Sequence, residues 1–403
     1  MFRYKILTVF LFLILLDATL AIEINSCRAI SAPGNYVLTN DIVGAPTQIP
    51  GSNKNSCITI SAVDNVNLDC QNQSISANGS GLGKYGAYIK NSRGLRLTKC
   101  QIAGYETGVF VDRLDEGYFL DNHISSSILF GVQILNSSNN TFESESYVRN
   151  GFVTNTAGLK FVDSSDNLVR ESYFYQNPAI TFFASGAGIE ISGNSNRNTI
   201  KENVFEANRI GVELNRNSSN TTMSQNEFYN NLAGATYIYG ADDTKIENEI
   251  YDSPQKGLVV SNDLGYASRP IKFTATKIIL SNRIANPNTK VILSIEDTVA
   301  PNEAYNIDWS GPTFQRPRSK SFADKYFLIR PMILQVPAFS IDKLTVSWHD
   351  SELVSGLDYE DGFRLWRYGN VGWQNTNAQL DTLVNTLKIS NVNVAGTYTI
   401  LQN

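Results

Sequence analysis

Two glutamates in this chain have the type and spacing that acid–base chemistry requires. Glu190 and Glu213 each stand two residues after a glycine, in the matching tetrads 188–191 and 211–214. If the tetrads are strands that pair with each other, the two carboxyl groups approach the roughly 5–5.5 Å separation of the catalytic pair in retaining glycoside hydrolases. A solvated face on which Lys160 balances Glu190 is the simpler interpretation, since exposed carboxylates are common on protein surfaces. The sequence leaves both interpretations open.

The same position after a glycine recurs along the chain with other side chains. Because successive residues of a strand alternate between faces, the residue two after each glycine is expected on the outer face. This row reads Tyr88, Phe110, Gln133, Lys160, Glu190, Glu213, Thr236 and Val259. Aromatic faces stack on sugar rings, and polar neighbours bond sugar hydroxyls. The row therefore predicts a carbohydrate-binding surface made by Tyr88, Phe110, Gln133, Lys160, Glu190 and Glu213.

The elements that would position this row are copies of one short apolar stretch that begins with glycine. The copies start at Gly86, Gly108, Gly131, Gly158, Gly188, Gly211, Gly234 and Gly257. Short strands that recur with a nearly constant period indicate a solenoid, whose rungs bury a core only by stacking. Long inserts at residues 145–157 and 175–187 explain the two enlarged steps. We expect these inserts to wall a groove or to pack against a second domain.

A second kind of strand follows each glycine-started stretch, after a turn rich in Asn and Ser. Apolar residues stand five apart there, around a recurring polar position. That position is filled by Cys100, Asn122, Asn203 and Asn226, with Asn248 close to the same register. A helix would instead place apolar residues three and four apart. Asn tolerates the left-handed conformation, so the pattern predicts a strand, a sharp corner and another strand.

Glycine-started strands followed by corners such as Asn-Ser-Ser-Asn-Asn-Thr at 136–141 resemble right-handed parallel β-helix repeats. Repeats of this kind occur in NosD-type and carbohydrate-binding/sugar-hydrolase (CASH) domains of the pectate-lyase-like superfamily. The resemblance implies an all-β chain with a right-handed single-stranded parallel β-helix over residues 63–262, preceded by an N-terminal cap over 22–62. Its motifs are structural, so the resemblance implies a fold and leaves the activity open.

Beyond residue 262 the repeat stops. Strand-like runs without a fixed period, separated by loops with Pro and Gly, predict an antiparallel β-sandwich over 263–403. The segment 363–373 resembles the late hairpin of immunoglobulin-like modules of exported proteins. We expect Trp366 and Trp373 in this segment to pack within the hairpin and the core rather than to bind sugars.

The first residues predict export. Arg3 and Lys5 precede an apolar run from Ile6 to Leu16, and a small residue follows at Ala21. These features are typical of a secretory signal peptide, here residues 1–21. An uncleaved anchor is the alternative, although the run is short for a membrane span. We therefore expect a secreted or cell-surface protein with no transmembrane span in the mature chain.

All four cysteines lie in the first quarter of the chain, and in an exported protein they favour two disulfides. Stacked strands lie about 4.8 Å apart, within the range of Cα separations that a disulfide bridges. Cys70 and Cys100 occupy the same strand of successive rungs, which predicts that they pair. Cys27 and Cys57 would then close the cap. A zinc site is disfavoured, because no Cys-x-x-Cys pair and no nearby histidine are present.

Other chemistries find little support. The net charge of −5 argues against a nucleic-acid partner, and the two histidines, His123 and His349, supply neither a catalytic triad nor a copper or other metal site. The tetrad 240–243 resembles the paired aspartates of polygalacturonases, but their other signatures are missing. We expect no cofactor and no metal.

Together these features predict an exported, monomeric cell-surface β-helix protein that binds a polysaccharide or glycan. Two alternatives stay open. One is a polysaccharide lyase, epimerase or glycoside hydrolase, with Glu190 and Glu213 as weak catalytic candidates. The other is a purely structural or adhesive surface protein. A groove beside the two glutamates would favour the enzyme, and a flat, evenly polar face would favour the structural role.

Overall fold

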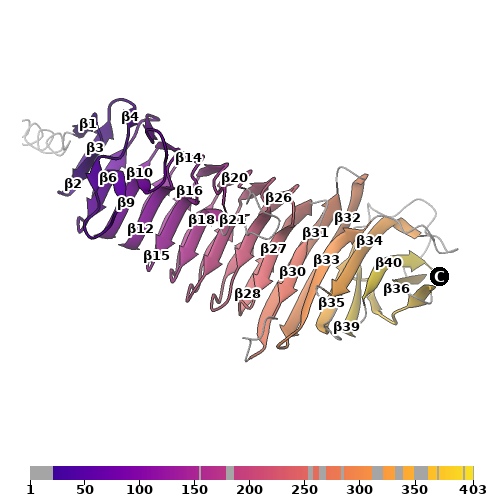
Figure 1. Cartoon of the computed structure of the whole chain (residues 1–403). Helices are drawn as coiled ribbons and strands as arrows, with labels where there is room; N and C mark the ends of the chain where they lie inside the picture. Colours follow the sequence, from indigo (N-terminus) through magenta and orange to yellow (C-terminus); the bar gives the residue numbers. More distant parts are fainter. Residues whose placement is uncertain are drawn as a thin grey trace, which may run out of the picture.

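A computed structural model describes the chain in residues 21–153, 156–177, 186–252, 257–262, 269–282, 286–310, 321–331, 339–348, 362–369, 372–393 and 395–402. The predicted signal peptide lies almost wholly outside these residues, as does most of the 175–187 insert. The named secondary-structure elements of the described residues are all β-strands. They stack into a long prism that runs from the N-terminal cap to the C-terminal strands (Figure 1).

The prism is a parallel β-helix built from two sheets. Each turn contributes one longer strand to sheet B, in the order β6 (Asn55–Ser61), β9 (Lys84–Arg93), β12 (Thr107–Asp115), β15 (Phe130–Leu135), β18 (Thr156–Val162), β21 (Gly186–Ser192), β24 (Ile210–Leu214), β27 (Gly234–Tyr239) and β30 (Leu258–Ser261). Each of these strands pairs in parallel with the corresponding strand of the next turn.

Two short strands per turn follow and form sheet A, separated by a corner. They are β7 (Val66–Asp69) and β8 (Ser74–Ser76), β10 (Arg96–Thr98) and β11 (Gln101–Ala103), β13 (Tyr118–Leu120) and β14 (His123–Ser125), β16 (Thr141–Glu143) and β17 (Ser146–Val148), β19 (Leu168–Arg170) and β20 (Tyr173–Tyr175), β22 (Thr199–Lys201) and β23 (Val204–Glu206), β25 (Thr222–Ser224) and β26 (Glu227–Tyr229), and β28 (Thr244–Glu247) and β29 (Ile250–Asp252). This confirms the predicted sequence of strand, sharp corner and strand.

The core consists of like residues stacked from turn to turn. Phe174, Phe205 and Phe228 lie parallel, with ring centroids 4.8 Å apart at each step. The recurring glycines have a steric cause at the edge of this core. A Cβ on Gly188 would lie 2.7 Å from the carbonyl oxygen of Gly211 and 2.6 Å from the Phe205 ring. A side chain at Gly188 would overlap the backbone of the next turn, which explains why glycine stands at this position in most turns.

Two positions differ from the sequence-based register. Glu213 pairs with Tyr237 and not with Thr236, because Ala235 occupies the glycine position of its turn and Gly234 lies one residue earlier. Thr236 is fully buried and belongs to the inner face. In sheet A the recurring polar position is occupied by Glu249, whose carboxylate accepts a hydrogen bond from Asn226, and Asn248 is the preceding turn residue with positive φ.

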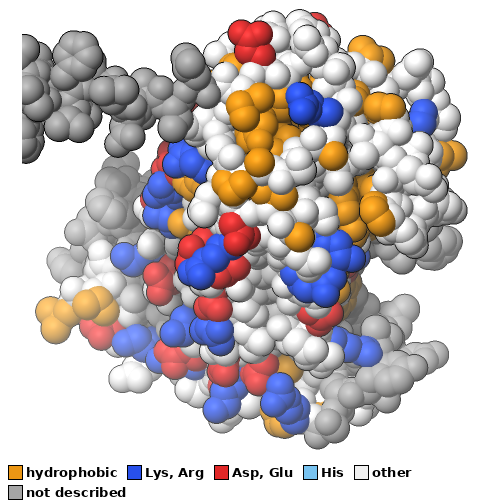
Figure 2. Space-filling model, turned by 90° about the vertical axis from the view of Figure 1, so that its left-hand side faces the viewer, with side chains coloured by type: hydrophobic (Ala, Val, Ile, Leu, Met, Phe, Trp, Pro, Cys, Tyr) orange, Lys and Arg blue, Asp and Glu red, His pale blue; other side chains and the backbone are white. Residues whose placement is uncertain are grey.

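The N-terminal cap contains β1 (Ile22–Ile24), β2 (Arg28–Ile30), β3 (Gly34–Leu38), β4 (Ile42–Val43) and β5 (Thr47–Gln48), which join the ends of the two sheets. Both predicted disulfides are present. Cys27 and Cys57 are bonded with a Cα separation of 4.5 Å, and Cys70 and Cys100 with 4.8 Å. On this end of the molecule, basic and acidic side chains are intermixed and form no large area of one sign (Figure 2).

The C-terminal strands extend the two sheets of the β-helix. β31 (Ile271–Asn282) pairs in parallel with β28 and β29, and the strands beyond it, like those that extend sheet B, pair antiparallel. Sheet A continues through β31 (Ile271–Asn282), β32 (Asn286–Val299), β35 (Ile341–Ser347), β39 (Thr386–Val392) and β38 (Gln379–Asp381). Sheet B continues through β33 (Ala304–Ser310), β34 (Ser321–Pro331), β40 (Gly396–Gln402), β36 (Phe363–Gly369) and β37 (Gly372–Asn375). One continuous hydrophobic core runs through both regions. An immunoglobulin-like sandwich over 263–403 stays a prediction.

Candidate functional site

The predicted row of outward residues is in register on sheet B. Consecutive pairings join Tyr88 to Phe110, Phe110 to Gln133, Gln133 to Lys160, Lys160 to Glu190 and Glu190 to Glu213. The row therefore crosses strands β9 to β24, which lie side by side along the prism (Figure 1). The structure brings all six predicted site residues together on one face.

This row is covered rather than freely solvated, which corrects the expectation of an open outer face. Tyr88, Glu190 and Glu213 are only 8%, 6% and 7% exposed, and Phe110, Gln133 and Lys160 are half-buried. A neighbouring outward row explains much of the cover. Phe130, Ala157, Ala187 and Ile210 lie beside it and form a second apolar cluster with Tyr237 and Val259.

One end of the row is an aromatic stack. Tyr88 lies parallel to Phe110, with centroids 5.5 Å apart, and Tyr85 stacks on both rings. The Lys54 ammonium lies 5.1 Å from the centroid of the Tyr85 ring and is ion-paired with Glu106. Ile49 packs against the same rings. The aromatic pair predicted from the sequence is thus part of a small, well-packed cluster.

The middle of the row is charged. The Lys160 ammonium lies 2.8 Å from Glu190 Oε1 and 5.2 Å from the centroid of the Phe130 ring. The Asn215 side chain donates a hydrogen bond to the same Glu190 oxygen at 3.3 Å. The predicted balance between Lys160 and Glu190 is therefore real, but the pair is nearly buried instead of solvated.

Glu213 lies in surroundings that favour its protonated form. Burial raises the pKa of Glu213 to about 7, and the negative charge of Glu190 adds to this effect. A hydrogen bond from Asn215 and the positive charges of Lys160 and Arg209 oppose it. One carboxyl group neutralised by Lys160 and a second that titrates near neutrality form a pair able to bind and to move a proton.

Both carboxyl groups retain an unused acceptor. The Oε2 atoms of Glu190 and of Glu213 are buried and have no hydrogen-bond partner in the described part of the chain. Buried polar atoms of native proteins are nearly always partnered. Two such atoms on adjacent strands are therefore acceptors for which the described residues supply no donor.

The row continues beyond the residues identified from the sequence. Glu213 pairs with Tyr237, Tyr237 with Val259, and Val259 with Asn306 of β33. Next to Asn306, the buried Asp308 accepts hydrogen bonds from the side chains of Asn306 and Arg330, each at 2.6 Å. Sequence reasoning missed these residues because β33 and β34 run antiparallel and carry no repeat that would reveal their register.

The remaining sequence candidates lie elsewhere. His123 is an exposed residue of sheet A, with its Nδ1 atom 3.2 Å from Ser146 Oγ, and His349 lies outside the described residues. Asp242, from the tetrad 240–243, lies at a corner and is bridged to Ser219. Within the described residues, no cluster of His, Cys, Asp and Glu side chains has the arrangement of a metal site, and no helix is long and apolar enough to span a membrane.

Comparison with known proteins identifies the fold. Residues 56–219 match the family model of the right handed beta helix region, which confirms the predicted right-handed β-helix in this part of the chain. No curated protein matches the sequence significantly.

Among solved structures, tailspike protein 2 of Escherichia coli O157:H7 bacteriophage CAB120 is similar, with 13% identity, a TM-score of 0.44, and coverage of 96% of this chain and 69% of the tailspike. An alginate lyase from Paenibacillus sp. str. FPU-7 has 13% identity and a TM-score of 0.37, over 56% of this chain and 87% of the lyase. The DFA-IIIase of Arthrobacter chlorophenolicus A6 has 11% identity and a TM-score of 0.38, over 60% of this chain and 56% of that enzyme. These similarities concern the fold alone.

Proposed function

We propose that this right-handed β-helix protein binds a polysaccharide or glycan along the outer face of sheet B, with its chain direction along the row from Tyr88 to Glu213. The observation that carries the proposal is the pair of buried, unpartnered carboxylate oxygens of Glu190 and Glu213. Leaving such an acceptor unpaired costs about 1–3 kcal/mol. Hydroxyl groups of a sugar would supply the missing donors.

The rest of the row supports the same kind of ligand. Phe110 and Gln133 are partly exposed members that offer a ring and an amide, and the nearly buried Lys160 ammonium adds a positive charge. From Tyr88 to Arg330 the row and its extension span roughly 40 Å, at about 4.8 Å per strand. That length suits an extended polymer better than a compact metabolite.

A glycan-array screen of the mature chain, followed by calorimetry on the best ligand, tests this proposal. Replacing both carboxylates, as Glu190→Gln with Glu213→Gln, should weaken binding, because each amide keeps one acceptor and loses the charge. Glu247→Gln, an exposed glutamate of sheet A, is the matched control and should bind like the parent chain. Equal affinity of the double variant and the parent would reject this face as the binding site.

Glycoside hydrolysis is the second candidate, and the raised pKa of Glu213 beside the ion-paired Glu190 favours it. Glu213, with a pKa of about 7, would give its proton to the leaving sugar oxygen as the glycosidic bond breaks. Glu190 would attack the anomeric carbon, and water would then cleave the glycosyl ester while Glu213 takes back a proton. Product analysis by chromatography tests this second candidate. If the protein is a hydrolase, Glu190→Gln alone and Glu213→Gln alone should each abolish turnover, while each reduces saccharide binding only in part.

The location of the protein belongs to the same proposal. Two disulfides are typical of proteins that fold in an oxidising compartment. Together with the predicted signal peptide, they support a secreted or cell-surface protein. A purely structural or adhesive role would instead predict that no saccharide of the array binds to the row.

A further inference from the structure

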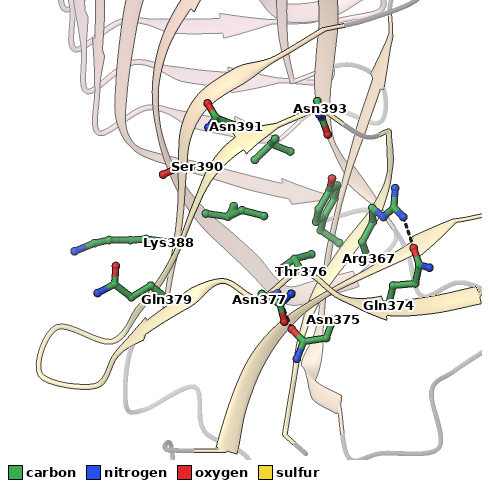
Figure 3. Close-up of a pocket in the computed structure, with 13 residues that line it drawn as sticks. Arg367, Gln374, Asn375, Thr376, Asn377, Gln379, Lys388, Ser390, Asn391 and Asn393 are labelled. Carbon is green, nitrogen blue, oxygen red and sulfur yellow. Dashed lines mark hydrogen bonds between the residues drawn. The ribbon is translucent and has the colours of Figure 1, made fainter.

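A polar pocket lies at the C-terminal end of the molecule, away from the row. Its volume is about 530 Å³, within the range of small-molecule sites. It is lined from both sheets, by residues of β36, β37 and β40 on one side and of β38 and β39 on the other (Figure 3). Six asparagine or glutamine side chains and one arginine are among its lining residues: Gln374, Asn375, Asn377, Gln379, Asn391, Asn393 and Arg367.

Arg367 gives the pocket its charge. It pairs with Tyr398 across β36 and β40, and Tyr398 is buried in the core, so Arg367 lies on the inner side of its sheet. Its guanidinium donates to the Gln374 side chain, and no carboxylate within the described residues is ion-paired with it. The pocket lining contains no Asp or Glu. Lys388 also lines the pocket, but its side chain points away from the centre (Figure 3).

The amides supply neutral hydrogen-bonding groups around this cation. The side chains of Asn377, Asn391 and Asn393 have no hydrogen-bond partner in the described part of the chain, and all three are exposed at the mouth. An amide both donates and accepts, which suits hydroxyl groups. Ile389, Val392 and Tyr398 add an apolar wall that fits the carbon face of a sugar ring.

We propose that this pocket binds a carboxylated saccharide, with the planar carboxylate on the Arg367 guanidinium and the ring hydroxyls on the surrounding amides. A guanidinium binds a carboxylate through two parallel hydrogen bonds, and a site without acidic groups favours an anion. A peptide carboxyl terminus would share the carboxylate contact. It would leave most of the amides around the mouth without the hydroxyl partners that a sugar offers.

Titration calorimetry with a glucuronate trisaccharide tests the proposal, with a glucose trisaccharide and an acetylated dipeptide as competing probes. The parent chain should bind the glucuronate probe at least tenfold more tightly than either of the others. Arg367→Gln should weaken this binding at least tenfold, and Arg367→Lys, which keeps the charge without the fork, should weaken it by less. Asn377→Asp should also weaken it, since it places a negative charge at the mouth without altering the sheets.

Arg149→Gln is the matched control, because Arg149 is an exposed arginine that also donates to a glutamine, Gln176, but lies in the turn after β17 of the β-helix. It should bind like the parent chain. Glu190→Gln with Glu213→Gln should leave this binding unchanged, which separates the pocket from the proposed binding face. The proposal is overturned if folded Arg367→Gln binds like the parent, or if the glucose probe or the dipeptide binds as tightly as the glucuronate probe.

Discussion

Glu145 accepts two hydrogen bonds from Asn122, one from the backbone N–H at 3.0 Å and one from the side-chain amide at 2.9 Å. The pair lies at the inner corner of sheet A, where Asn203 and Asn226 repeat the same side-chain-to-backbone contact between other turns. Glu145 is 2% exposed, and burial raises the pKa of its carboxyl to about 8, partly offset by the hydrogen bonds from Asn122. The corner therefore holds a carboxylic acid that stays protonated at neutral pH.

The raised pKa of Glu145 predicts that stability falls as pH rises. The folded protein keeps the proton up to about pH 8, whereas the unfolded chain loses it near pH 4.3. Between pH 5 and 7.5 the folded state thus binds more protons, and this group removes about 1.4 kcal/mol of stability per pH unit. In Glu145→Gln that contribution disappears. The free energies of unfolding of the variant and the parent, measured by urea denaturation, should therefore diverge steadily over this range.

Glu143→Gln is the control for this experiment. Hydrogen bonds from Tyr118 and Arg170 lower the pKa of Glu143, so its contribution to stability is constant above its ordinary pKa and is lost only in more acidic solution. The free-energy curves of Glu143→Gln and the parent should stay parallel from pH 5 to 7.5. Parallel curves for Glu145→Gln as well would show that Glu145 is ionised in the folded protein.

A second prediction concerns the recurring glycine. Gly188→Ala should destabilise the β-helix by more than about 2 kcal/mol, since the added Cβ would overlap the Gly211 carbonyl and the Phe205 ring in a packed interior. Ala235→Gly, at the equivalent position of a later turn, should cost at most about 1 kcal/mol. Chemical denaturation of both variants measures this. Equal costs would mean that the glycine recurs for a reason other than close backbone contact.

The sequence predicted the β-helix well because its residues are constrained by a repeated contact. Glycine is needed where a carbonyl oxygen of the next turn lies close, and Asn is needed where its side chain bonds the backbone of a neighbouring turn. Both residues therefore recur in the sequence with the period of the turns. The face on which Glu190 and Glu213 lie could be predicted from strand alternation. The burial of this face could not be predicted, because the side chains that cover it belong to a neighbouring row that includes Phe130 and Ile210. Asp308 and Arg367 could not be placed at all, since antiparallel strands without a repeat give no register.

The two disulfides predict that the N-terminal end loses structure first under reducing conditions. Both bridges, Cys27–Cys57 and Cys70–Cys100, lie in the cap and the first turns. Loss of a native disulfide costs about 2–5 kcal/mol in small secreted domains. Hydrogen exchange read by mass spectrometry should quicken in β6 to β10 before it does in β22 to β26. Peptide mapping that found four free thiols in secreted material would contradict the bridges themselves.

The two faces of β21 predict different costs for adjacent substitutions. Ile189 is fully buried in the stack, so Ile189→Asp places an unpaired charge in the core and should prevent folding. Glu190→Ala should also destabilise, by about 1–3 kcal/mol, because it leaves the half-buried Lys160 ammonium without its partner at 2.8 Å. Yield of folded protein and urea midpoints compare the two. A Glu190→Ala cost as large as that of Ile189→Asp would mean that the faces of this strand are reversed.

The last prediction separates stability from binding at the aromatic end of the row. An exposed platform would tolerate Tyr88→Ala with Phe110→Ala, but Tyr88 is 8% exposed and stacks on both Tyr85 and Phe110. We therefore expect the double variant to lose stability, with Tyr88→Ala alone costing on the order of 3 kcal/mol. Tyr88→Phe keeps the ring and should preserve the unfolding midpoint.

Phe110→Leu, which removes a ring from the partly exposed position and keeps its apolar volume, is then the cleaner test of glycan contact. If sugar rings stack on Phe110, calorimetry on a ligand from the array should show weaker binding by Phe110→Leu and unchanged binding by Tyr88→Phe. Unchanged affinity in both variants would remove the aromatic end from the proposed binding face and confine it to the stretch from Gln133 to Glu213.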